Sequence, residues 1–287
     1  MSLGQMPWAL WRAQLFAILR LEMKKSFITR RGLWIYFLAF APAALFAFHS
    51  FIELKHGSPG NLGQDTHIFA AVFQFFFLRL AVFFGCVGIF LNLFRGEVVE
   101  KSLHYYFLVP LRREILVAGK FLSGLIAAMV IFGASIVLQF VALYWQFSPN
   151  GVQEYLFHGH GLEHFAAYLG VTLLACVGYG SVFLAAGVLF GNPLIPTVVV
   201  LAWEAASGFL PELLQKFSVI FYLKSLCPVG IPEAIAQDRG NPLALIAVNP
   251  APASPATAIL GLLILSVVVL VFSSLQVRRL QIDYGAD

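Results

Sequence analysis

Two oppositely charged residues lie inside apolar stretches of this sequence, where charge is costly. Arg79 lies about eleven residues, or roughly 16 Å of helix, into one stretch, and Glu204 lies about as deep in another. A lone charge at the centre of a bilayer costs about 2.5–3.5 kcal/mol on insertion scales, so such residues usually face the interior of a helix bundle and pair. We therefore predict that Arg79 and Glu204 interact, within one subunit or across a dimer. Their role is either in a pathway through the membrane or in a structural ion pair.

Three histidines lie close together in a polar segment with the sequence HGHGLEH. They are His158, His160 and His164. Imidazoles at this spacing could bind zinc or copper, although a complete site needs a further ligand. Histidines in loops are more often simply solvated. No metal site is predicted, and the three histidines are kept only as candidates.

Motifs of enzyme chemistry are missing from the sequence. It has no His-Glu-x-x-His, no Gly-x-Ser-x-Gly and no pair of aspartates in the apolar stretches. A phosphate-binding loop needs Gly-x-x-x-x-Gly-Lys followed by Ser or Thr. The Gly119-Lys120 pair is followed by Phe121 and has no glycine five positions before Gly119. We therefore predict that the chain is not an enzyme and binds no cofactor itself.

The composition indicates that lipid is the main solvent of this protein. Of its 287 residues, 60% are hydrophobic and 11% are charged, with a mean hydropathy of +0.85. Soluble domains carry about 25% charged residues, so a soluble fold could not hydrate such a surface.

The apolar stretches predict an all-α integral membrane domain, 1–287, with six transmembrane helices in 33–275. Each apolar stretch is close to the roughly 20 residues that a crossing requires. The six predicted spans cover about 33–54, 68–94, 119–147, 165–190, 194–210 and 253–275.

The remaining segments are predicted to lie at the two membrane surfaces. Within 1–32, the spacing over 7–29 favours an amphipathic helix in the membrane interface over a plain cytosolic helix. Between the fifth and sixth spans, short extracellular helices are expected near 211–226 and 231–238. A cytoplasmic tail, 276–287, ends the chain.

The distribution of Lys and Arg predicts the orientation. Thirteen of these residues lie before the first span, after the sixth, or in the loop after the second span extended to Lys120 at the start of the third, against four on the other side. Cytoplasmic loops carry the excess of positive charge, so both termini are expected in the cytoplasm, with the chain multi-pass in the cell (inner) membrane. The basic excess thus reflects topology, and nucleic acid is not an expected partner.

The segment 97–120, EVVEKSLHYYFLVPLRREILVAGK, carries the clearest motif. In its place between the second and third spans, it resembles permeases of the ATP-binding-cassette type-2 transporter family. The matching positions are Glu97, Glu100, Leu103, Pro110, Arg112, Arg113, Glu114, Gly119 and Lys120. Many members have a Gly-Thr-Leu-Glu-like run where this chain has Lys101-Ser102-Leu103-His104, which changes the expected docking surface. The six-span layout with an interfacial N-terminal helix is also similar.

The resemblance implies a permease that couples to a separate ATPase through this segment. The expected coupling residues are Glu97, Glu100, Lys101, Leu103, Pro110, Leu111, Arg112 and Arg113. Apolar side chains of a short helix would enter a groove of the partner, and charged ones would form a polar rim. The alternative is a loop that only reconnects two spans.

The implied assembly is an exporter with two permeases and two cassette ATPases. ATP and Mg would bind the ATPases, and the permease would form a homodimer or pair with a related permease in contact with membrane lipid. The aromatic-rich spans fit an amphipathic or lipid-like substrate, but equally fit lipid-facing packing.

Two other functions remain open from the sequence. One is a non-transporting membrane scaffold or assembly factor. The other is an intramembrane enzyme that uses Glu204 or the loop histidines.

Overall fold

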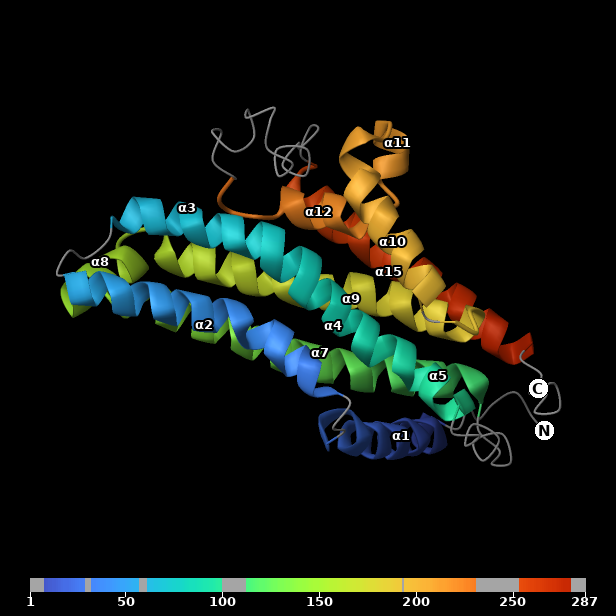
Figure 1. Cartoon of the computed structure of the whole chain (residues 1–287). Helices are drawn as coiled ribbons and strands as arrows, with labels where there is room; N and C mark the ends of the chain where they lie inside the picture. Colours follow the sequence, from blue (N-terminus) through green and yellow to red (C-terminus); the bar gives the residue numbers. More distant parts are fainter. Residues whose placement is uncertain are drawn as a thin grey trace.

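A computed structural model describes residues 8–28, 32–56, 61–99, 112–192, 194–230 and 253–279. Every regular element in these ranges is a helix, as Figure 1 shows. The helices are α1 (Trp8–Ile28), α2 (Leu33–His56), α3 (Leu62–Val72), η2 (Phe73–Val82), α4 (Phe83–Cys86), η3 (Val87–Leu91), α5 (Asn92–Val99), α7 (Arg113–Tyr144), α8 (Pro149–Phe157), α9 (Gly161–Leu189), α10 (Leu194–Ala206), η4 (Ser207–Phe209), α11 (Glu212–Gln215), α12 (Val219–Ser225) and α15 (Pro255–Arg279).

Five helical segments are long and apolar enough to cross a membrane. They are Leu33–His56, Leu62–Phe94, Arg113–Tyr144, Gly161–Leu189 and Pro255–Val277. The all-α prediction is confirmed, and these segments overlap the first four and the last of the predicted spans. The second is one continuous helix built from α3, η2, α4, η3 and α5.

The predicted fifth span, 194–210, is shorter than the others. Its main helix, α10, has 13 residues. It rises about 20 Å, or about 24 Å with η4, whereas the hydrocarbon core is about 30 Å thick. The chain then turns through α11 and α12, and α12 packs against α9 and α15. The helical piece predicted near 211–226 is thus two short helices; the piece near 231–238 lies outside the described residues.

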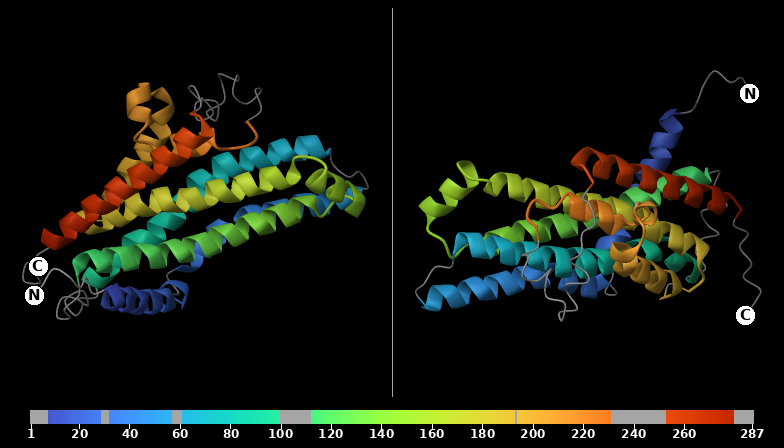
Figure 2. Two further views of the ribbon diagram at one scale, coloured as in Figure 1. Left: turned by 180° about the vertical axis from the view of Figure 1, so that it is seen from behind. Right: turned by 90° about the horizontal axis from the view of Figure 1, so that it is seen from above.

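The long helices run side by side, with α1 packed beside one end of the bundle (Figures 1 and 2). We call this end the base: α5 ends and α7 begins there, and α15 ends there too. At the opposite, far end, α2 ends, α3 begins and α8 leads into α9. The helix predicted over 7–29 is present as α1, and its position in a membrane interface stays a prediction.

Aromatic side chains of the second span form the core of the bundle. Phe69, Phe73 and Phe77 are buried, and the Phe69 and Phe73 rings meet Tyr168 of α9 at 4.9 and 4.6 Å between centroids. Phe77 packs edge-on against Phe132 of α7. These phenylalanines therefore pack helices together inside one chain and do not face lipid.

Candidate functional site

A buried ion pair joins three helices at the base. The Lys120 ammonium in α7 donates to Glu22 Oε1 in α1 at 2.7 Å and to the Leu93 carbonyl oxygen in α5 at 2.8 Å. Lys120 is fully buried and Glu22 is 3% exposed. Buried charges are tolerated when they are paired and hydrogen-bonded, and this pair meets both conditions.

Close packing of α1 on α7 places the two charges together. Gly119 precedes Lys120, and a Cβ built at Gly119 would lie 2.8 Å from Cγ2 of Ile18. Ile18 is buried and lies one helical turn before Glu22, so both point from the same face of α1 toward α7. The Gly119-Lys120 pair thus has a physical explanation. The absence of a side chain at Gly119 lets α1 pack closely against α7, and Lys120 forms an ion pair with Glu22 of α1.

Substituting Gly119 with Leu is expected to push α1 away from α7, because Ile18 occupies the space that the new side chain needs. Limited proteolysis should then cleave α1 faster than in the unaltered protein. Gly170→Leu in α9 is the matched control, since a Cβ there meets no atom within 4 Å. Equal cleavage of both variants would contradict this role for Gly119.

Two arginines hold the start of α7 at the base. The Arg112 guanidinium lies over the Trp11 ring of α1, 4.5 Å from its centroid. Arg113 donates from a terminal guanidinium nitrogen to the Val277 carbonyl oxygen of α15 at 2.9 Å. Residues that follow the segment 100–111 are therefore attached to both α1 and α15.

The other predicted coupling residues are less fully described. Glu97 lies in the helix α5, which leads into the segment. Glu100, Lys101, Leu103, Pro110 and Leu111 lie outside the described residues. The described part of the base thus consists of the helices that flank the segment 100–111 and of α1 and α15 beside them.

A second polar cluster surrounds Glu204 at the end of α10. The Glu204 carboxylate accepts hydrogen bonds from the Ser218 hydroxyl at 2.8 Å and from the backbone N–H groups of Val219 and Ile220, both at 2.9 Å. These N–H groups belong to the first turn of α12, whose partial positive charge favours an anion. Glu204 therefore caps α12 from a helix fourteen residues or more away in sequence.

Arg79, Tyr179 and Lys224 lie around this carboxylate. Arg79 and Glu204 are close enough to attract each other, and both act electrostatically on the buried Tyr179 of α9. Lys224 of α12 is attracted to Glu204 and repelled by Arg79. We call Arg79, Tyr179, Glu204 and Lys224 the midspan cluster, because Arg79 lies about halfway along the second span, within the π-helical stretch η2.

The midspan cluster bears on two predictions made from the sequence. Arg79 and Glu204 lie close enough for their charges to attract each other, while a direct ion pair and the role of the two residues stay predictions. The carboxylate oxygens of Glu204 are engaged by three donors of α12. That arrangement suits a helix cap and disfavours a role for Glu204 as a catalytic base.

The candidate histidines lie at the far end, near the start of α9. The Tyr155 hydroxyl and Nδ1 of His164 are 3.1 Å apart, and the rings of His160 and His164 are 6.1 Å apart between centroids. Within the part of the chain that the structure describes, no group of three or more His, Cys, Asp or Glu side chains is arranged to hold a metal ion. The candidates His158, His160 and His164 therefore do not form such a group.

Sequence reasoning did not predict that Lys120 and Glu22 form an ion pair. Lys120 is one of the positions that carry the resemblance in 97–120, and nothing in that resemblance predicts that it pairs with Glu22 of α1. Their burial shows that a charge at the edge of an apolar run can be an internal contact. A usable signal was the close-packing Gly119 beside Lys120.

No protein-family model and no curated protein matches this chain. The residues that the structure describes are those of a multi-pass, all-helical membrane protein, with five apolar helices long enough to span and with buried polar clusters around Lys120 and Glu204.

Proposed function

We propose that this chain is the permease subunit of an ATP-driven exporter of the cassette type-2 kind. A separate ATPase would bind the segment between the second and third spans at the cytoplasmic surface. In this proposal α10 is a short fifth crossing, so the chain crosses six times and both termini are cytoplasmic.

The observation that carries the proposal is the three-way contact of Lys120. Its bonds to Glu22 and to the Leu93 carbonyl oxygen fasten α1, α5 and α7 to one another at the base. Because α5 and α7 flank 100–111, a force on that segment would move α1 and both spans together. A loop that merely reconnects two spans would not need this rigid attachment.

The contact of Arg113 extends the same unit to the last span. Its hydrogen bond to the Val277 carbonyl oxygen brings the end of α15 beside the start of α7. A stroke from the ATPase would therefore reach the second, third and sixth spans. ATP and Mg would bind two copies of the ATPase, and two permeases would enclose the path for the substrate.

The test is co-purification of the permease with a cassette ATPase, which the proposal expects to be encoded beside it. We expect the unaltered chain to recover the ATPase and Leu103→Asp to recover about tenfold less, as loss of one apolar anchor predicts. Leu162→Asp is the matched control, because Leu162 is exposed at the far end.

Two outcomes would overturn the proposal. A stable complex that contains no ATPase would favour the scaffold or assembly-factor function. Labelling of residues 97–113 from outside the cell would remove both the topology and the coupling role.

A further inference from the structure

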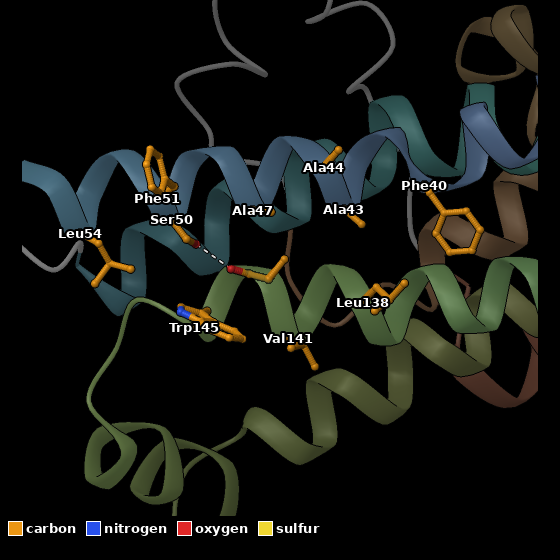
Figure 3. Close-up of a pocket in the computed structure, with 11 residues that line it drawn as sticks. Phe40, Ala43, Ala44, Ala47, Ser50, Phe51, Leu54, Leu138, Val141 and Trp145 are labelled. Carbon is orange, nitrogen blue, oxygen red and sulfur yellow. Dashed lines mark hydrogen bonds between the residues drawn. The ribbon is translucent and has the colours of Figure 1, made fainter.

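An apolar groove of about 700 Å³ runs between α2 and α7 toward the far end (Figure 3). Its lining combines small residues along α2 with larger apolar residues at its two ends and along α7. The lining residues used below are Phe40, Ala43, Ala47, Ser50, Phe51 and Trp145. The groove is open on its outer side, since Phe51 and Trp145 are more than half exposed.

The interior of the groove suits a hydrocarbon chain. Among the lining residues, Ser50 alone has a side-chain hydroxyl. That hydroxyl donates a hydrogen bond to the Ala142 carbonyl oxygen at 2.7 Å. The described lining therefore offers no unsatisfied hydroxyl to a polar solute. Ala43 and Ala47 lack the bulk to fill the space, which leaves a channel along α2.

The length of the groove matches one leaflet of a bilayer. From Ala43 to Leu54, α2 rises about 16 Å, and one leaflet contributes about 15 Å to the hydrocarbon core. Phe40 lies at one end of the groove and Leu54 at the other (Figure 3), and we call the Leu54 end, which lies toward the far end of the bundle, the mouth. The volume also falls within the range of about 300–1,000 Å³ that is typical of ligand sites.

The mouth of the groove carries a positive charge. The Lys55 ammonium lies over the ring of Phe51, 5.5 Å from its centroid, and Phe51 lines the groove. Glu53, two positions earlier, points from a different face of α2. Trp145 is 74% exposed beside the mouth, and exposed tryptophans lie at the level of lipid headgroups.

We infer that this groove binds one acyl chain of an anionic phospholipid from the surrounding bilayer, with the lipid phosphate at Lys55. The apolar channel takes the chain, and the cation at its mouth selects the charged headgroup. Binding of this kind needs no ATPase partner, so it can be tested apart from the proposed function.

The experiment uses the full chain in nanodiscs that contain phosphatidylglycerol with a photoreactive group on one acyl chain. We expect crosslinks to concentrate on residues 40–54 and 138–145. Ala47→Phe fills the channel and should lower labelling there about tenfold. Ala202→Phe, at an exposed position of α10, is the matched control and should leave labelling unchanged.

The headgroup is tested with phosphatidylcholine that carries the same photoreactive chain. We expect weaker labelling than with phosphatidylglycerol, and Lys55→Gln should remove the difference while labelling at Ala43 persists. Equal labelling by both lipids in the unaltered protein would overturn the headgroup assignment.

The unaltered protein gives a measurement that does not depend on the folding of any variant. Labelling spread evenly over exposed apolar positions such as Val198 of α10 and Ile264 of α15 would overturn the site. Disulfide formation between two copies of Ala47→Cys, without lipid crosslinks at the groove, would show that a second copy of the chain covers it instead.

Discussion

Replacing Lys120 with Met is expected to destabilise the protein by about 3–5 kcal/mol, because the buried Glu22 carboxylate then loses its cation. The carbonyl oxygen of Leu93 loses a donor at the same time. Equilibrium unfolding in mixed micelles, followed by circular dichroism, would measure the change. α1 should detach first, since the ion pair is a direct polar contact between it and α7.

A double variant separates the loss of the pair from the cost of an unpaired charge. Replacing a buried ion pair by apolar residues of similar size is often nearly neutral. Glu22→Leu combined with Lys120→Met should therefore recover most of the stability that Lys120→Met loses. Lys216→Met is the control, because Lys216 is exposed. If Lys216→Met costs as much as Lys120→Met, the base is not held as described.

Replacing Glu204 with Ala is expected to cost at least about 3 kcal/mol, because three donors at the start of α12 lose a charged acceptor. Glu204→Gln keeps one carbonyl acceptor and should cost less than Ala. Thermal unfolding of the purified protein would rank the variants. Glu212→Ala, at an exposed position of α11, should have little effect.

Exchanging the charges of Arg79 and Glu204 would not test their interaction, because Glu204 also caps α12. An arginine at 204 would bring a cation to the start of α12 and could not accept its N–H groups. The doubly exchanged protein would then be unstable even if Arg79 and Glu204 attract each other. A double-mutant cycle with Arg79→Met and Glu204→Gln avoids this problem and should give a coupling energy of about 0.5–3 kcal/mol. Strict additivity of the two changes would contradict the interaction.

The predicted spans illustrate what hydropathy can determine. All five long apolar helical segments overlap spans that the sequence predicted, namely the first four and the last, because the transfer of apolar residues into lipid depends mainly on local composition. The stretch 194–210 met the same criterion of composition but forms a helix of 13 residues followed by one short turn. Near the end of this helix, the carboxylate of Glu204 accepts hydrogen bonds from the start of α12.

The two charged clusters mark the other limit of sequence reasoning. The sequence predicts that Arg79 and Glu204 lie inside the bundle, since each lies well inside an apolar run; Glu204 is buried and Arg79 is partly buried. The cap on α12 could not be predicted, because the donors lie on an element whose position depends on packing against α9 and α15. Likewise, Lys120 and Glu22 are 98 positions apart in sequence.

The sequence by itself determined that this is a helical membrane protein, which segments are apolar enough to span, and which residues are too charged to face lipid. The tertiary structure decided which charges meet, how α1 is fastened to the base, and where a groove opens between α2 and α7. The physical reason is that solvent transfer is a property of each segment, whereas pairing and packing depend on the relative positions of segments far apart in the chain.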